Sequence, residues 1–109
     1  MAYDVDLADR IRAELAGSPG VTEKRMFGGL AFLIDDRLTI AASSQGGALV
    51  RVDPAGTAQL LARTTAEPAV MRGREMAGWL RVPPHALRTR RQLAPWVARS
   101  SAYVRSLGS

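Results

Sequence analysis

Apolar and polar positions along the chain follow two periods, one typical of helices and one typical of strands. Between Leu7 and Leu15 the apolar residues recur every three or four positions, with charged residues between them. This spacing predicts an amphipathic helix over residues 5–16 that is capped by Asp4 or Asp6.

Apolar runs bounded by turn residues follow in the middle of the chain and again before the last helical pattern. They predict five strands, over residues 25–34, 38–42, 48–52, 69–72 and 75–82. Within the first three strands and within the last two, the connections are only a few residues long. Short connections of this kind favour antiparallel pairing.

Two further helices are predicted from their starting signals. Asp53 and Pro54 suit the cap and the first position of a short helix over residues 55–63. Thr89 and Gln92 have the spacing of a capping box at the start of the last helix. In that helix the inward positions form one stripe, which contains Leu93, Trp96, Val97, Ser100, Tyr103, Val104 and Leu107.

The resulting order is helix, three strands, helix, two strands, helix. Strands and helices do not alternate strictly, so a doubly wound parallel sheet is not expected. We predict an α+β fold: a two-layer sandwich with a mainly antiparallel sheet of about five strands and with helices packed on one face. A length of 109 residues suits a single domain over residues 1–109.

The composition of the chain excludes several kinds of binding site and several cellular locations. The chain has no cysteine, which excludes disulfides and thiolate metal ligands. No apolar run approaches the roughly 18 residues that a membrane span requires. The N-terminus is acidic, unlike the basic start of a signal peptide. We therefore expect a cytoplasmic protein without membrane contact.

A search for catalytic and metal-binding patterns finds no complete one. His85 is the only histidine, and no serine lies in a nucleophile-elbow context. The adjacent Asp35 and Asp36 fit a hairpin turn, because neighbouring turn residues point apart and make poor acid–base partners. The pair Gly28-Gly29 lacks phosphate-loop spacing and is interpreted as a strand bulge or a close backbone approach. We predict a protein that is not an enzyme and needs neither cofactor nor metal.

The charge is distributed unevenly along the chain. Its net value is +5, but residues 1–69 sum to −2 and residues 70–109 sum to +7. All basic residues of the second part are arginines, which bind carboxylates and phosphates in a bidentate manner. The arginines of the final helix fit a solvated helix face. The alternative is a phosphate-facing surface formed by Arg72, Arg74, Arg81, Arg88, Arg90 and Arg91.

Four sequence blocks occur in a specific order. Their order and spacing match a known pattern over roughly residues 5–107, which is nearly the whole chain. They are 24–29 (KRMFGG), 49–53 (LVRVD), 78–83 (GWLRVP) and 93–96 (LAPW). This order resembles the TfoX N-terminal domain family. The chain departs from the family pattern where Arg51 replaces a lysine and where Trp79-Leu80 replaces a tyrosine pair.

The resemblance implies a YgaC/TfoX-N-like fold that is often dimeric, and a link to the regulation of natural competence with the transcription machinery. It does not imply an enzyme. We predict a regulatory binding module with a protein or nucleic-acid partner; the alternative is a homodimeric interaction domain without a nucleic-acid role. A third alternative is a small-molecule or enzymatic role centred on Gly28-Gly29, in which Arg25 and Arg51 hold an anion. The residues expected to form or support the binding surface are Arg25, Phe27, Gly28, Gly29, Arg51, Arg72, Arg74, Trp79 and Arg81.

Overall fold

The computed structural model describes residues 3–26 and 28–108 of the chain. In this part it is an α+β fold, which confirms the predicted class. The helices are α1 (Val5–Glu14), α2 (Thr57–Arg63) and α3 (Arg90–Leu107). The short 3₁₀ helices η1 (Pro54–Gly56) and η2 (Pro84–Ala86) precede α2 and α3. The strands are β1 (Val21–Met26), β2 (Gly29–Ile34), β3 (Arg37–Ala42), β4 (Ala48–Arg51), β5 (Glu67–Met71) and β6 (Arg74–Val82).

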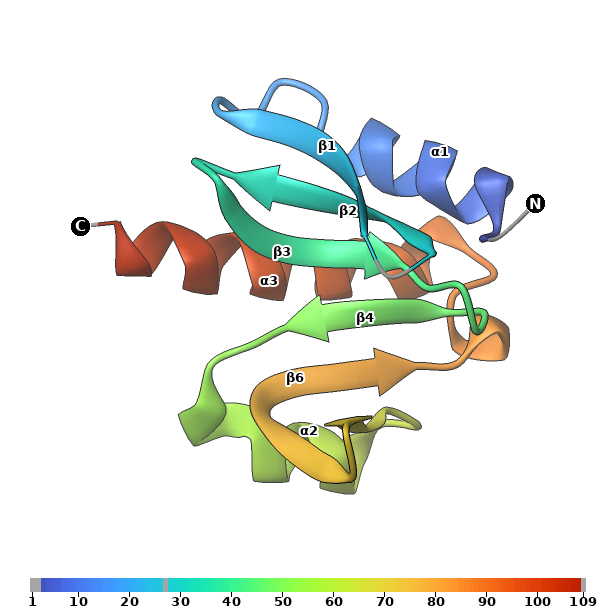
Figure 1. The fold of residues 1–109 in the computed structure, drawn as a ribbon, viewed down its shortest axis with the longest axis vertical. Coiled ribbons are helices and arrows are strands. Elements are labelled where there is room, and N and C mark those ends of the chain that lie inside the picture. The colour runs from blue at the N-terminus through green and yellow to red at the C-terminus, as the bar shows by residue number, and fades with distance from the viewer. Residues whose placement is uncertain (1–2, 27, 109) are drawn as a thin grey trace.

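The strands form one antiparallel sheet in the order β1-β2-β3-β4-β6-β5. Helix α3 packs against β3 and β4, and α1 packs beside α3 and against β3. Figure 1 shows the sheet from its other side, with α3 running behind β3 and β4. Thus α1 and α3 cover one face of the sheet. No helix of the described part covers the opposite face, which we call the uncovered face.

The prediction of one strand over residues 25–34 is wrong, because these residues belong to two strands. β1 and β2 pair from Val21 opposite Ile34 to Met26 opposite Gly29, so the chain reverses between Met26 and Gly29. The described sheet therefore has six strands rather than about five. The sequence pattern misses β1 because its middle residues are polar and exposed, and an exposed edge strand lacks the alternation of a half-buried one.

The two glycines explain this reversal. Gly28 has a φ of +79°, in the left-handed region that glycine adopts without a steric penalty. Gly28 is therefore part of a turn, and the alternative of a bulge within a strand is wrong. The close backbone approach is confirmed for Gly29, because a Cβ there would collide with the carbonyl oxygen of Ala42 in β3. The backbone that comes close is the chain's own.

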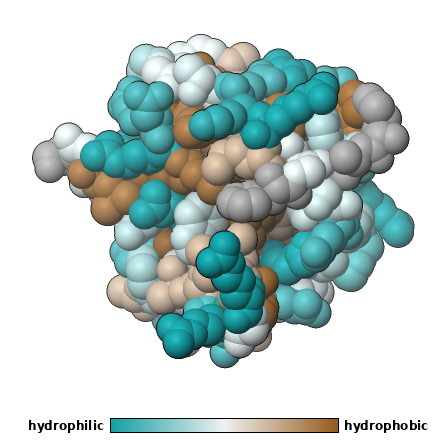
Figure 2. Space-filling model, viewed as in Figure 1, coloured by the Kyte–Doolittle hydropathy of each residue, from teal (hydrophilic) through white to brown (hydrophobic). Residues whose placement is uncertain are grey.

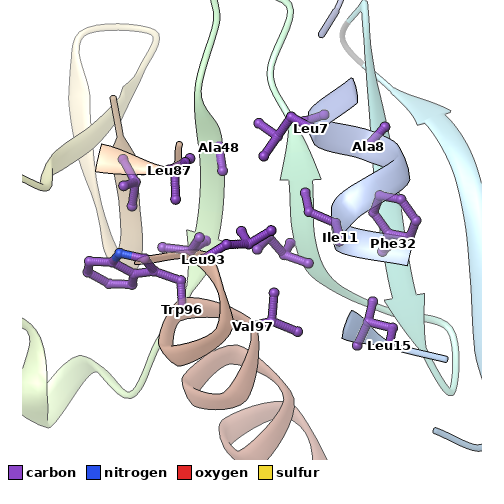
Figure 3. Packing of buried hydrophobic residues seen from close by; sticks show 14 of the residues in the cluster. Leu7, Ala8, Ile11, Leu15, Phe32, Ala48, Leu87, Leu93, Trp96 and Val97 are labelled. Carbon is purple, nitrogen blue, oxygen red and sulfur yellow. The ribbon is translucent and has the colours of Figure 1, made fainter. Parts of the chain in front are cut away.

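The core lies between the sheet and the two long helices. Leu30, Phe32 and Ile34 of β2 are buried there with Ile40 of β3 and Val50 of β4. Figure 3 shows the side chains of α1 and α3 meeting in this core, with the ring of Phe32 next to α1. The apolar stripes that predict these helices are therefore buried against the sheet over most of their length. The exceptions on α3 are Tyr103, which is partly buried, and Leu107, which is exposed although its position in the stripe predicts an inward side chain.

The predicted helix starts are confirmed in detail. Asp4, rather than Asp6, accepts a backbone hydrogen bond in the first turn of α1. Asp53 caps η1, which leads directly into α2. Thr89 and Gln92 form the reciprocal hydrogen bonds of a capping box at the start of α3. Local signals of this kind depend on neighbouring residues alone, which is why they can be identified from sequence.

Ser100 lies on the buried stripe of α3, and its hydroxyl has no hydrogen-bond partner among the described residues. Leaving a buried hydroxyl unpaired costs about 1–3 kcal/mol, so Ser100→Ala should raise the free energy of unfolding by about 1 kcal/mol. Ser101→Ala, at the next position of the same helix, measures the gain from helix propensity alone. Urea unfolding of the three proteins checks the prediction. Equal gains in both variants would contradict it.

A bidentate ion pair joins α1 to the edge strand β1. The Arg12 guanidinium donates hydrogen bonds from Nε and Nη2 to the Glu23 carboxylate, at 2.6 and 2.7 Å. These bonds hold the pKa of Glu23 below its usual value. The stability that they contribute is therefore present above the usual pKa of a glutamate, and it is lost as the pH falls through the lowered pKa.

Glu23→Gln tests this contribution. We expect it to lower the free energy of unfolding by less than about 1 kcal/mol near neutral pH, because the pair is partly exposed to solvent. Urea unfolding between about pH 7 and about pH 2 should show the difference from wild type shrinking as Glu23 becomes protonated. A difference that stays constant over this range would show that the ion pair is not its source.

Candidate binding site

A row of paired residues crosses the uncovered face of the sheet from edge to edge. Successive Cα partners, starting at β1, are Lys24, Ala31, Ala41, Leu49, Arg81 and Glu67. Directly opposite residues in antiparallel strands place their side chains on the same face. The row therefore has three apolar residues in its middle and a charged residue near each end.

A bulge in β3 adds Leu38 to this face. The ladder between β2 and β3 shifts, so that Phe32 pairs with Ile40 and Leu33 pairs with Leu38. Thr39 is the extra residue, and it is fully buried. Because of this shift, Leu38 faces the uncovered side while Ile40 remains in the core.

The middle of the uncovered face is hollow. A cavity of about 140 Å³ lies over the sheet, and its floor contains Met26, Gly29, Ala31, Leu38, Ala41 and Leu49. The hollow forms because the small residues glycine and alanine leave space above the sheet that larger side chains would fill. Figure 2 shows hydrophobic side chains on this side of the molecule between hydrophilic ones. An apolar hollow of this kind on a surface is typical of binding sites.

One wall of the cavity is the tip of the β5–β6 hairpin, residues 69–75. Ala69, Val70 and Met71 line the cavity from this hairpin tip. Val70 and Met71 remain 57% and 36% exposed, so the wall also presents apolar surface to solvent. The tip lies over the sheet because β6 bends at Gly78, which has a φ of +81° and accepts a hydrogen bond from the Val52 N–H at 2.8 Å.

A second wall is polar and is built around Arg81. Its guanidinium donates hydrogen bonds to the Gln45 side-chain oxygen and, at 3.0 Å, to Ser43 Oγ. These bonds join β6 to the loop between β3 and β4, and all three residues line the cavity. Arg81 is half-buried and forms no ion pair within the described part of the chain. A positive charge is thus held in place beside the apolar hollow.

Several of the predicted surface residues meet at this cavity. Gly29 and Arg81 line it, and Gly28 lies beside Ser44, another lining residue. Arg72 and Arg74 are exposed and flank the turn of the hairpin tip. Phe27 lies outside the described residues.

The remaining predicted residues do not reach the cavity. Arg25 lies opposite Leu30, a core residue, so its register places it on the helix-covered side of β1. The Arg51 guanidinium lies 5.5 Å from the Trp79 ring and 5.6 Å from the Tyr103 ring. Strands β2 and β3 separate Arg25 from Arg51, and the geometry therefore offers no support for an anion held between these two arginines.

The arginines of residues 70–109 lie on several elements of the fold. Arg72 lies in the turn before β6 and Arg74 is the first residue of β6, whereas Arg88 and Arg91 flank the start of α3. Others have partners within the protein: Arg90 pairs with Glu14 at 2.8 Å, and Arg99 lies 4.7 Å from the ring of Trp96. Of the six arginines considered for a phosphate-facing surface, Arg90 is thus paired within the protein.

Sequence reasoning missed the apolar residues of the site, above all Ala41, Leu49 and Met71. One available signal is the composition of β2, which reads GLAFLI and is apolar at successive positions. A strand with one solvated face alternates apolar and polar residues, whereas a run that is apolar on both faces indicates that both are covered. Here the helices cover one face of the sheet. The apolar run of β2 therefore indicates that the other face is also shielded from water.

Other kinds of site receive no support from the described residues. Within residues 3–26 and 28–108, histidine, cysteine and acidic side chains form no group of three that suits a metal ion. His85 is exposed in η2. Over the same ranges, none of the helices combines the length and apolar character needed to cross a bilayer.

Comparison with known proteins gives one match. The family model described as the TfoX N-terminal domain matches residues 13–103. This range contains the whole sheet, the uncovered face and most of α3. No curated protein and no solved structure matches the chain.

Proposed function

The chain belongs to the TfoX N-terminal domain family, and from this premise we propose that it is a regulatory module that acts by binding a partner protein rather than by catalysis. The family resemblance points to regulation of transcription or natural competence, and we propose that the module acts in the cytoplasm. The binding surface in this proposal is the uncovered face of the sheet, with the cavity at its centre.

The apolar hollow on the uncovered face is the observation that carries the proposal. A sheet face that needs no partner is normally polar, because exposed apolar area is unfavourable in water. Here Ala41 and Leu49 line a cavity whose wall includes the exposed Val70 and Met71. A partner that covers these side chains would remove their apolar area from water, which contributes roughly 25 cal/mol per Å².

A protein partner is favoured over nucleic acid by the placement of the arginines. Binding to a phosphate backbone needs several cations on one surface. Of the arginines considered for a phosphate-facing surface, Arg72 and Arg74 belong to the hairpin tip and three lie at the start of α3, while Arg81 is already bonded to Ser43 and Gln45. The apolar hollow has no counterpart in a phosphate-binding surface, and none of the arginines at the start of α3 lines it.

Ala41→Phe tests the proposal, because it fills the cavity from a half-buried position without removing a core side chain. We expect the immobilised wild-type chain to retain a specific protein from native cell extract, and we expect Ala41→Phe to lose it by about 10-fold or more. Leu107→Lys is the matched control, since Leu107 is an exposed apolar residue on α3. Equal retention by wild type and Ala41→Phe, with both folded by circular dichroism, would refute this role of the face.

Two further measurements separate the alternatives. Light scattering of wild type and Ala41→Phe tests the homodimer, because a dimer that only the variant loses would make the uncovered face a self-association surface. Titration of labelled duplex DNA at low and moderate salt tests the nucleic-acid alternative. We expect neither a face-dependent dimer nor DNA binding.

A further inference from the structure

We propose that the uncovered face binds an acidic segment of the partner protein, with one large apolar side chain of that segment filling the cavity. This inference deepens the proposed function and rests on it. The arguments are the charge around the cavity, the size of the cavity and the width of the face.

The charge around the cavity is positive. Lys24 precedes the apolar part of the row and Arg81 follows it, while Arg72 and Arg74 lie at the hairpin tip. Two acids are nearby, Glu67 opposite Arg81 and Glu75 opposite Val70. Four basic residues against two acidic ones leave a net positive rim, which complements an acidic segment.

The same charges disfavour a second copy of this chain as the occupant. A twofold-symmetric dimer brings the same surface patch of both subunits together. Lys24 and Arg81 of one copy would then meet the equivalent basic residues of the other across an apolar contact. Like charges placed opposite each other at an interface are unfavourable, whereas carboxylates from a different protein would be attracted.

The size of the cavity suits one side chain. Its volume is about 140 Å³, close to the roughly 150 Å³ of an engineered apolar cavity that accepts benzene. A leucine, methionine or phenylalanine side chain is therefore of the right size. Met71 and Val70 on the hairpin tip and Leu49 on the floor would contact it.

The width of the face sets the length of the segment. Four strand spacings separate Lys24 on β1 from Arg81 on β6, which is about 19 Å at 4.8 Å per strand. An extended chain covers about 3.3 Å per residue, so roughly six residues span the face. The apolar residue would lie near the middle of this segment, with carboxylates two or three residues away on either side.

The test uses selection from a library of random 12-residue peptides displayed on phage, with the full chain as bait. We expect enriched peptides to contain Leu, Met or Phe with Asp or Glu within three positions, and to bind more weakly as salt rises. Selections that enrich basic or uncharged flanks, or no peptide at all, would overturn the inference.

Charge reversal provides the second arm. Lys24→Glu combined with Arg74→Glu changes two exposed residues and leaves the core intact. We expect this variant to lose the selected acidic peptides by at least about 10-fold and to enrich lysine-flanked peptides with the same apolar residue. Arg88→Glu combined with Arg91→Glu gives the same change of net charge near α3, and it should leave acidic selection unchanged. Equal effects of the two pairs would show a response to net charge rather than a site.

Failure of this inference differs from failure of the proposed function. If Ala41→Phe abolishes retention of the cellular partner but the selected peptides show no acidic preference, the face binds a partner of other chemistry. If Ala41→Phe leaves retention unchanged, the face is not the binding surface and both proposals fail.

Discussion

Replacing Gly29 with alanine is expected to destabilise the protein by roughly 3 kcal/mol, at the upper end of the usual effect of overpacking. Gly29 is the first residue of β2, and its backbone packs directly against β3. The added methyl group would meet the carbonyl oxygen of Ala42 and approach the backbone N of Ser44. Neither atom can rotate away as a side chain would, so the ladder between β2 and β3 has to separate.

Equilibrium unfolding in urea measures this loss, and Gly56→Ala is its matched control. Gly56 has no neighbouring atom within 4 Å of an added Cβ, and its φ is negative. Because alanine narrows the unfolded ensemble without strain there, that variant should be neutral or more stable by up to about 1 kcal/mol. If Gly29→Ala is as stable as Gly56→Ala, the close approach of β2 to β3 does not affect the free energy of unfolding.

The parts of the fold that depend on neighbouring residues could be predicted from the sequence. The capping box of Thr89 and Gln92, the cap at Asp53 and the apolar stripe of α3 all follow from spacing within one element. The class of the fold follows from the order of the elements. These signals are local, so no knowledge of distant contacts is needed to interpret them.

The first hairpin could not be predicted, because β1 is recognised by its pairing with β2 and not by a pattern of apolar residues in its own sequence. β1 is an exposed edge strand with Thr22, Glu23, Lys24 and Arg25 in its middle. Its polarity resembles a loop until β2 is known to lie beside it. The left-handed conformation of Gly28 decides between a turn and a bulge, and two consecutive glycines are compatible with either.

The binding site depends on registers that a single sequence does not contain. Lys24, Ala41 and Arg81 lie on three strands and are brought into one row by four separate pairings. Shifting any strand by one residue would place its side chains on the other face. Arginine content suggested a phosphate-facing surface as an alternative, and of the six arginines considered only Arg81 lines the cavity.

Gly78 connects the fold to the cavity, and we expect Gly78→Ala to destabilise the protein and to weaken binding at the uncovered face. Its φ of +81° costs an alanine about 1–2 kcal/mol. In addition, the new Cβ would lie 3.0 Å from both Pro54 Cγ and the Val52 carbonyl oxygen. Crowding adds to the conformational penalty, for a total of roughly 2–3 kcal/mol.

Gly73→Ala is the matched control, because it measures the penalty of the backbone conformation without crowding. Gly73 has a φ of +78°, close to that of Gly78, but no atom lies within 4 Å of an added Cβ. We expect Gly73→Ala to lose only the conformational part, about 1–2 kcal/mol, and to retain the cellular partner. Gly78→Ala should lose more stability in urea. It should also retain less partner under conditions where both variants are fully folded, because the bend at Gly78 places Val70 and Met71 over the sheet. If the two variants retain the partner equally, the hairpin tip is not part of the binding surface, and the floor of the cavity alone would have to account for recognition.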